Sequence, residues 1–351
     1  MVATRRRFEV PPSRIATSPP EHRDRARDHI RLLVARPGSV DHLRFDALPA
    51  VLRAGDLVVV NDSATRPAAI DGFLHARPVV VHLSTALDDG AWMVELRRAD
   101  GSGPLLGPVN DDTVWLAGGG SVRLLRPAVA PGTRLRHAML TVPNDDIAVF
   151  MAVHGRPITY GPQARRWPLA AYQTVFARRP GSAEMPSAGR PFSHRTVTEL
   201  VTHGVAIAPI TLHAGVSSPE RHEPPGSEWY EVPPATAALV RHTHRAGGRV
   251  IAVGTTVTRA LETVAADDGT VRSGAGWTRL VLSPDRSARV VDALLTGWHE
   301  ADASHLQLLD AVAGAALVDR AYAAAIDGHY LWHEFGDACL LLPQRRSDLT
   351  P

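Results

Sequence analysis

Residues 236–264 read TAALVRHTHRAGGRVIAVGTTVTRALETV, and their pattern decides the fold class. Residues 236–245 have the spacing of a helix, and Gly247-Gly248 follows as a signal that ends it. The apolar run 249–253 then reads as a buried strand. Gly254-Thr255-Thr256 opens a second helix. A strand between two helices is typical of an α/β domain.

The same alternation continues on both sides of this stretch. Upstream, Ser193 is placed to cap a helix, and a strand follows at 205–212. Downstream, we predict strands at 288–291 and 335–342, with two helices between them in 303–327. Strands that alternate with helices in this way extend the α/β domain to the end of the chain.

The N-terminal part has the same character. Strands are predicted at 30–35 and 56–60, and a short helix is predicted between them at 46–53. We therefore predict one discontinuous α/β domain made of residues 1–67 and 159–351.

The intervening segment, 68–158, has a different pattern of apolar and turn-forming residues. Two apolar runs, 78–84 and 91–98, flank Asp88-Asp89-Gly90, which is a hairpin signal. Further short strands follow this hairpin. The segment is therefore predicted to be a β-rich domain inserted into the α/β domain.

The composition excludes several classes of chemistry. All 38 basic residues among the 351 are arginine, so lysine Schiff bases, lysine-anchored pyridoxal phosphate and lysine phosphate loops are excluded. The single cysteine, Cys339, excludes intramolecular disulfides and cysteine-built metal sites. The 17 histidines form no pair with an obvious carboxylate as third ligand, so we expect no metal. Without a long apolar run or a signal peptide, we expect a cytoplasmic protein and no membrane partner.

Candidate site residues lie just beyond the predicted strands, because ligands of α/β folds bind where loops and helix N-termini converge. The candidates by this rule are Asn61-Asp62-Ser63, His213, Gly254-Thr255-Thr256, Asp292 with Thr296, and Asp337.

Each candidate also has a structural interpretation. Gly254-Thr255-Thr256 suits a carboxylate or phosphate, but also a plain helix N-cap. Asn61-Asp62 is a frequent turn pair. His213 fits a general base or a hydrogen-bonded structural histidine. Asp292 and Asp337 fit caps of neighbouring elements. The residues alone leave these alternatives open.

A basic cluster lies between residues 164 and 195. Arginines there alternate with aromatic residues, a combination that RNA-binding surfaces use for phosphate contact and base stacking. A solvated arginine-rich surface explains the same pattern. The cluster comprises Arg165, Arg166, Arg178, Arg179, Arg190 and Arg195, with Trp167, Tyr172, Phe176 and Phe192 among them.

Taken in order, a set of short segments resembles the S-adenosylmethionine:tRNA ribosyltransferase-isomerases of queuosine biosynthesis. The resemblance runs from about Phe8 to Leu342 and is weakest in 68–158. It implies a barrel-like α/β domain with an inserted β-barrel domain. The segments are 56–62, 172–176, Pro186-Ser187-Ala188-Gly189, Thr211-Leu212-His213, 253–256 with Arg259 and Glu262, Gly276-Trp277-Thr278, 291–296 and Gly336-Asp337-Ala338.

The resemblance also implies a reaction. Family members transfer the ribosyl part of S-adenosylmethionine to the aminomethyl group of a 7-deazaguanine in tRNA, isomerise it, and release adenine and methionine without a metal. On this basis His213 or Asp62 would transfer protons. Arg259 and Glu262, three residues apart, would instead form a structural ion pair. The S-adenosylmethionine-binding residues would be Gly254, Thr255, Thr256, Asp292, Thr296 and Asp337, and the tRNA-binding residues Arg165, Arg166, Arg178, Arg179 and Arg190.

Several polar residues of the family pattern are missing. Ala64 stands where an arginine is usual, Arg190-Pro191 stands where Leu-His is usual, and Gly226 stands where a histidine is usual. Ser217-Ser218-Pro219 and 296–299 also depart from the pattern. Arg66 and Arg190 are two residues able to replace the missing arginine. The losses leave two alternatives to the tRNA-modifying enzyme: a paralogue with a small-molecule acceptor, and a non-catalytic nucleoside-binding descendant.

Overall fold

Nine strands form one mixed sheet at the centre of the larger domain. The structure is a computed structural model that describes residues 8–128, 133–161, 165–216, 226–301, 303 and 305–344. From one edge to the other, the strands are β15 (Gly274–Thr278), β13 (Glu228–Val232), β12 (Ala206–Leu212), β3 (Leu57–Asn61), β14 (Val250–Val253), β16 (Ala293–Thr296), β17 (Ala338–Leu341), β1 (Arg31–Arg36) and β2 (Ser39–Arg44).

The central strands of this sheet are buried on both faces. On β3, Leu57 and Val59 point into one hydrophobic core, and Val58 and Val60 point into another. Helices α4 to α7 contribute to the first core, and α1 and α3 to the second. The helices are α1 (Leu48–Val51), α2 (Ile147–His154), α3 (His194–Thr202), α4 (Pro234–Arg245), α5 (Thr255–Thr263), α6 (His305–Ala313) and α7 (Ala315–Asp327). Short 3-10 helices are η1 (Pro12–Arg14), η2 (Pro20–Arg23), η3 (Phe45–Ala47), η4 (Pro143–Asp145), η5 (Leu169–Tyr172) and η6 (Ser187–Gly189).

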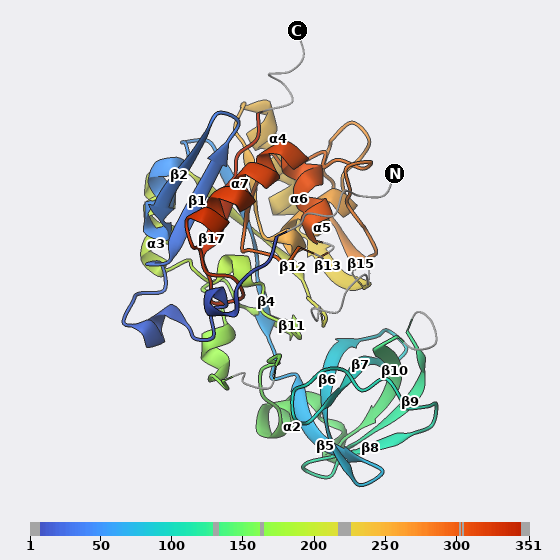
Figure 1. The fold of residues 1–351 in the computed structure, drawn as a ribbon. Helices are drawn as coiled ribbons and strands as arrows, with labels where there is room; N and C mark the ends of the chain where they lie inside the picture. Colours follow the sequence, from blue (N-terminus) through green and yellow to red (C-terminus); the bar gives the residue numbers. More distant parts are fainter. Residues whose placement is uncertain are drawn as a thin grey trace.

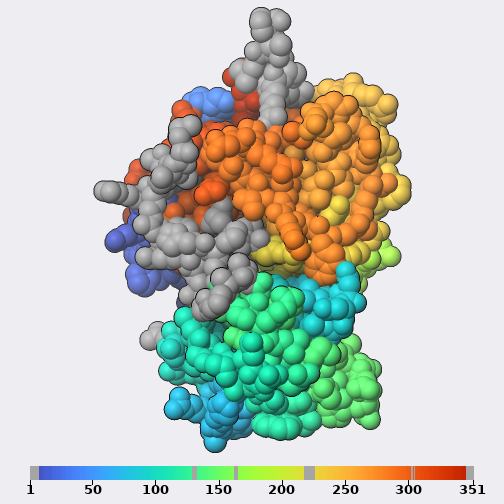
Figure 2. Space-filling view, turned by 90° about the vertical axis from the view of Figure 1, so that its right-hand side faces the viewer, coloured from blue at the N-terminus to red at the C-terminus, as the bar shows by residue number. Residues whose placement is uncertain are grey.

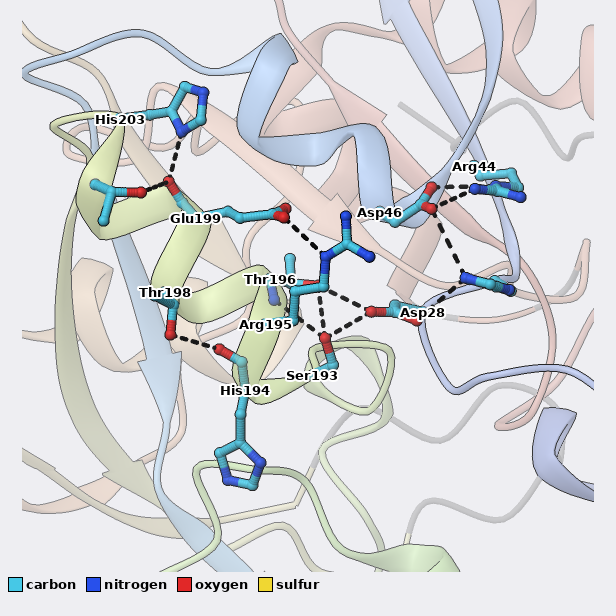
Figure 3. Close-up of polar contacts among 12 residues, drawn as sticks. Asp28, Arg44, Asp46, Ser193, His194, Arg195, Thr196, Thr198, Glu199 and His203 are labelled. Carbon is cyan, nitrogen blue, oxygen red and sulfur yellow. Dashed lines mark hydrogen bonds and ion pairs between the residues drawn. The ribbon is translucent and has the colours of Figure 1, made fainter.

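Ser193 caps α3, as the sequence predicts. Its Oγ accepts the backbone N–H of Thr196 at 3.1 Å and donates to the carboxylate of Asp28 at 2.6 Å (Figure 3). The cap therefore satisfies a helix N–H and also ties α3 to the N-terminal segment.

The inserted segment forms a closed six-stranded barrel beside the α/β domain (Figure 1). The predicted hairpin is confirmed, since β6 and β7 pair across the Asp88-Asp89-Gly90 turn. The α/β class with an inserted β-barrel is thus confirmed. In barrel order the strands are β10 (Leu135–Thr141), β7 (Trp92–Arg98), β6 (Arg77–Ala86), β5 (Ala69–Leu74), β8 (Thr113–Leu116) and β9 (Ser121–Pro127).

A small parallel pair, β4 (Ser63–Thr65) with β11 (Arg179–Ser182), lies between the large sheet and the barrel in Figure 1. In Figure 2 the barrel forms a separate mass below the α/β domain. All barrel strands fall within 68–158, and the boundaries of the two domains as such stay a prediction. No helix within the described ranges is long and apolar enough to cross a bilayer.

The strand predicted at 288–291 is wrong. The backbone N–H groups of Arg289, Val290 and Val291 donate to the buried carboxylate of Glu262 instead of to a strand partner. The strand of this region, β16, begins only at Ala293. The sequence also gives no sign of strands β2, β13 and β15, because they are antiparallel strands with few fully buried positions.

Candidate active site

The candidate residues, apart from Asp292, lie at one end of the parallel strands of the sheet. Strands β3, β12, β14 and β16 run parallel, so their carboxyl ends share that edge. Strand β17 runs the opposite way, with Thr296 paired to Cys339, so its N-terminus lies at the same edge. The edge thus collects Asp62, His213, Gly254, Thr296 and Asp337 from five separate parts of the chain.

Asn61 fastens three elements together at this edge. Its side-chain oxygen accepts the N–H groups of Ser63 and Leu212, both at 3.0 Å. Its amide nitrogen donates to the Leu212 carbonyl at 2.8 Å and to Thr256 Oγ1 at 3.3 Å. Asn61 is therefore a structural joint between β3, β12 and α5, whereas the sequence assigns it only to a turn or a strand end.

His213 is hydrogen-bonded to the first of two serine hydroxyl groups that form a chain. Its Nδ1 lies 2.8 Å from Ser63 Oγ, which in turn lies 2.6 Å from Ser182 Oγ. The imidazole stacks on Trp229 with ring centroids 5.2 Å apart. Gly181 also lies against the imidazole, since a Cβ there would fall 2.2 Å from Nδ1. These contacts hold the ring in one orientation. The Ser63 and Ser182 hydroxyls, in sequence, form a chain along which a proton can pass.

The charge state of His213 suits proton transfer at neutral pH. Burial, with the nearby charges of Arg66 and Arg179, lowers the pKa of His213 to about 4. The imidazole is therefore neutral at pH 7, with one ring nitrogen free of a proton.

Asp62 is buried, and its acceptor atoms are already engaged. Its carboxylate accepts the hydroxyl of Thr211 at 2.6 Å, and its carbonyl accepts the N–H groups of Arg178 and Arg179. The geometry therefore favours His213 over Asp62 as the proton-transfer group.

Gly254-Thr255-Thr256 forms the start of α5, as predicted. Gly254 has a φ of 91°, and a Cβ there would lie 3.2 Å from the Cβ of Ala188. No side chain caps the helix. Its first N–H groups are therefore available to an anionic group of a ligand, while Thr256 also accepts the hydrogen bond from Asn61.

Two histidines that the sequence did not predict as site residues lie near Thr296. Thr296 Oγ1 lies 3.1 Å from His299 Nε2, and the His299 ring stacks on His305 with centroids 4.7 Å apart. Burial lowers the pKa of His305 to about 4 and holds that of His299 well below its ordinary value. Both rings are therefore neutral at pH 7. The only pointer to them in the sequence is the departure of 296–299 from the family pattern.

The two aspartates differ in position. Asp337 lies at the site edge, where its carboxylate accepts the N–H groups of Arg31 at 2.9 Å and Leu331 at 2.8 Å. Asp292 lies at the other end of the strands, because it accepts the N–H of Val250 at the start of β14. The structure does not bring Asp292 together with the other candidates, since the strand expected before it is absent.

Arg259 and Glu262 do not pair with each other, so that prediction is wrong. Arg259 forms an ion pair with Glu228 and donates to the carbonyls of Leu280 and Gly226. Glu262 binds the backbone at 289–291. Both residues hold loops of the α/β domain in place.

The structure divides the predicted arginine cluster. Arg165, Arg166 and Arg178 are exposed. Arg179 pairs with Glu231 and donates to Thr211, and Arg190 is buried, where it pairs with Glu21. The aromatic residues Tyr172 and Phe192 are buried as well, so they cannot stack on bases. Only part of the predicted RNA-binding surface is therefore accessible.

The segment after His213 is fastened to both domains. The N–H of Ala214 donates to Ser182 Oγ at 3.0 Å, and the N–H of Val216 donates to Ser84 Oγ of the barrel at 2.8 Å. Arg134, also from the barrel, donates to the Val216 carbonyl at 3.5 Å. The altered Ser217-Ser218-Pro219 stretch lies outside the described residues. Nowhere in the described ranges do three histidine, cysteine or acidic side chains gather as a metal site.

A half-buried carboxyl, Glu334, gives the fold a pH dependence. Burial, with the nearby charge of Glu184, raises the pKa of Glu334 to about 8 from an ordinary value of 4.5. The folded state therefore holds more protons than the unfolded state between these values, and stability falls as pH rises through this window. We expect Glu334→Gln to raise the thermal unfolding midpoint by roughly 2 to 4 °C at pH 8.5 and to leave it unchanged at about pH 4.

Thermal scans of both proteins across this pH range test the expectation. Glu300→Gln, on an exposed side chain, is the matched control and should follow the native protein. A Glu334→Gln protein whose midpoint tracks the native one at every pH would show that this carboxyl ionises normally.

Fold and site define an α/β protein with an inserted β-barrel and a strand-edge site built around a neutral histidine. The sequence model described as "Queuosine biosynthesis protein" matches residues 4–341. This chain belongs to that family.

Named relatives match over nearly the whole chain. The S-adenosylmethionine:tRNA ribosyltransferase-isomerase of Acidiphilium cryptum is 36% identical, over 95% of this chain and 97% of that protein. The protein of the same name from Moorella thermoacetica is 33% identical, over 95% and 98%. The crystal structure of S-adenosylmethionine tRNA ribosyltransferase from Thermotoga maritima is 27% identical, with a TM-score of 0.53 over 95% of this chain and 99% of that one.

Proposed function

We propose that this protein is an S-adenosylmethionine:tRNA ribosyltransferase-isomerase. It would transfer the ribosyl part of S-adenosylmethionine to the aminomethyl group of 7-aminomethyl-7-deazaguanine in tRNA, isomerise it to the epoxide of epoxyqueuosine, and release adenine and methionine. The observation that carries the proposal is the neutral His213 at the head of a hydroxyl chain, in a protein of this family. A tRNA substrate would place the protein in the cytoplasm.

The chemistry needs little beyond proton transfer and binding. The positive sulfur of S-adenosylmethionine acidifies the protons on the neighbouring ribose carbon, so a modest base can start an elimination that opens the sugar and expels adenine. The acceptor amine then attacks, and methionine leaves as the epoxide closes. His213, with Ser63 and Ser182 behind it, is placed to move the protons. The uncapped start of α5 and Thr255 would bind carboxylate or hydroxyl groups of the substrate.

Adenine release tests the function. Purified protein is incubated with S-adenosylmethionine, with and without tRNA that carries the 7-aminomethyl-7-deazaguanine precursor. Adenine that appears only with this tRNA, together with a modified nucleoside in its digest, supports the proposal. Binding of S-adenosylmethionine without adenine release under any condition would instead identify a non-catalytic descendant.

One observation favours a small-molecule amine as an alternative acceptor. Arg179 and Arg190 of the predicted RNA-binding cluster are engaged in ion pairs within the protein. A paralogue with such an acceptor would release adenine when it is supplied with free 7-aminomethyl-7-deazaguanine as the acceptor. It would bind tRNA weakly. The same assay, with the free base in place of the tRNA, separates the two acceptors.

We propose that the exposed arginines Arg165, Arg166 and Arg178 bind phosphates of the tRNA backbone. Removing one arginine that binds a phosphate should reduce the slope of log affinity against log salt by about 1. We therefore expect the triple alanine variant to bind tRNA more weakly at low salt and with a slope shallower by about 3, as measured by filter binding. Arg245→Ala, on the exposed side of α4, should leave the slope unchanged. An unaltered slope in the triple variant would remove these residues from the interface.

A further inference from the structure

Arg66 lies at the junction of the two domains, next to the hydroxyl chain. Its backbone N–H donates to the Ser182 carbonyl at 2.9 Å. Its guanidinium carbon lies 5.1 Å from the ring centroid of Trp92, which is buried on β7 of the barrel. The side chain therefore reaches from the α/β domain to the barrel wall. It is close enough to His213 for its charge to lower the pKa of that imidazole.

The positive charge of Arg66 has no partner in the described parts of the chain. Its Nε is buried and finds no hydrogen-bond acceptor there, and no carboxylate of those residues forms an ion pair with it. Burial alone lowers the pKa of Arg66 to about 10, with no opposing contribution from an acid. The side chain is half-buried, and a partly buried charge without a counter-charge costs free energy. A negative group supplied by a ligand would offset this cost.

The other candidate for the missing family arginine, Arg190, is already satisfied. Its guanidinium pairs with Glu21 at 2.9 Å and donates to the Ala171 carbonyl at 2.9 Å. Arg66 thus differs from Arg190 in having hydrogen-bond donors to spare. The guanidinium lies over the Trp92 ring, and its N–H groups make no hydrogen bond to the described residues.

We infer that Arg66 binds the carboxylate of the methionine part of S-adenosylmethionine, and the inference rests on the proposed function. A guanidinium edge matches a carboxylate with two parallel hydrogen bonds. In this substrate a short carbon chain joins the carboxylate to the sulfur, and the sulfur is bonded in turn to the ribose carbon that loses a proton. An anion site beside His213 therefore fixes the reacting carbon near the imidazole. Arg66 is a positioning residue in this scheme.

Calorimetry with two ligands tests the inference. The first ligand is S-adenosylmethionine, and the second is its decarboxylated analogue, which keeps the sulfonium, ribose and adenine. We expect Arg66→Ala to weaken S-adenosylmethionine binding by roughly 10- to 100-fold, the range for a charge-assisted hydrogen-bonded pair. The same variant should bind the analogue as well as the native protein does. Arg123→Ala, on the exposed side of β9, is the matched control.

Other outcomes would overturn the inference. An equal loss for both ligands would show a structural role, and Arg66→Gln with a thermal scan checks whether the fold is kept. Weaker tRNA binding with unchanged S-adenosylmethionine binding would assign Arg66 to a phosphate instead. If the native protein binds S-adenosylmethionine and Arg66→Ala binds it equally well, only this inference fails. If the native protein does not bind S-adenosylmethionine, the proposed function fails with it.

Discussion

Replacing His213 by Gln is expected to slow adenine release by about 100- to 10,000-fold, the usual contribution of a positioned acid or base. Glutamine keeps a polar group near Ser63 but cannot take up a proton. The ring is held between Trp229 and Gly181, so the substitution should change the chemistry more than the shape of the site. Single-turnover assays with saturating S-adenosylmethionine measure the chemical step.

Two controls accompany this variant. Calorimetry should show that His213→Gln still binds S-adenosylmethionine, because a proton-transfer group contributes little to ground-state affinity. Ser63→Ala should give a smaller loss of activity, since it breaks the hydroxyl chain and leaves the imidazole in place.

The activity of the native protein should depend on pH through the same residue. Because the pKa of His213 is about 4, activity that depends on the neutral ring should hold from about pH 8 to 6 and decline toward pH 4. Unchanged turnover in His213→Gln would exclude the residue and leave Asp62 as the candidate base.

The second large effect concerns stability. Replacing Glu262 by Ala is expected to cost at least about 3 kcal/mol, because hydrogen bonds to a charged group contribute about 1.5–3 kcal/mol each. The carboxylate accepts three backbone N–H groups, from Arg289, Val290 and Val291, at 2.7 to 3.0 Å. The residue is only 3% exposed, so water cannot replace these bonds without opening the loop.

Urea denaturation followed by tryptophan fluorescence measures this loss. Glu262→Gln keeps one acceptor oxygen and should fall between the alanine variant and the native protein. Glu199→Ala breaks only a helix-surface pair with Arg195, and it should cost about 0.5 kcal/mol or less. A Glu262→Ala midpoint equal to that of Glu199→Ala would contradict the role given to this carboxylate.

Much of the fold could be predicted because local pattern and tertiary structure agree. The apolar run that forms β14 sits between helix signals, and the glycine after it has the positive φ that opens α5. The strand expected at 288–291 is absent for a long-range reason. Its apolar residues are buried by packing, but their N–H groups bond to Glu262, a contact that no local pattern reveals.

The sequence predicted where the site residues lie better than it predicted what each of them does. The rule of strand ends placed His213, Gly254 and Thr296 correctly at one edge, since it follows from the direction of parallel strands. The hydrogen-bond and ion-pair partners of these residues could not be predicted, because they come from segments far away in the sequence. Arg190 is an example: its burial against Glu21, 169 residues away, removes it from the surface.

The short stretch Ala214–Val216 couples the barrel to the imidazole mechanically. It starts at the residue next to His213 and ends on Ser84 and Arg134 of the barrel. A movement of the barrel relative to the α/β domain would therefore be transmitted along this stretch to the residue next to His213, and would disturb the hydrogen bond between the imidazole and Ser63.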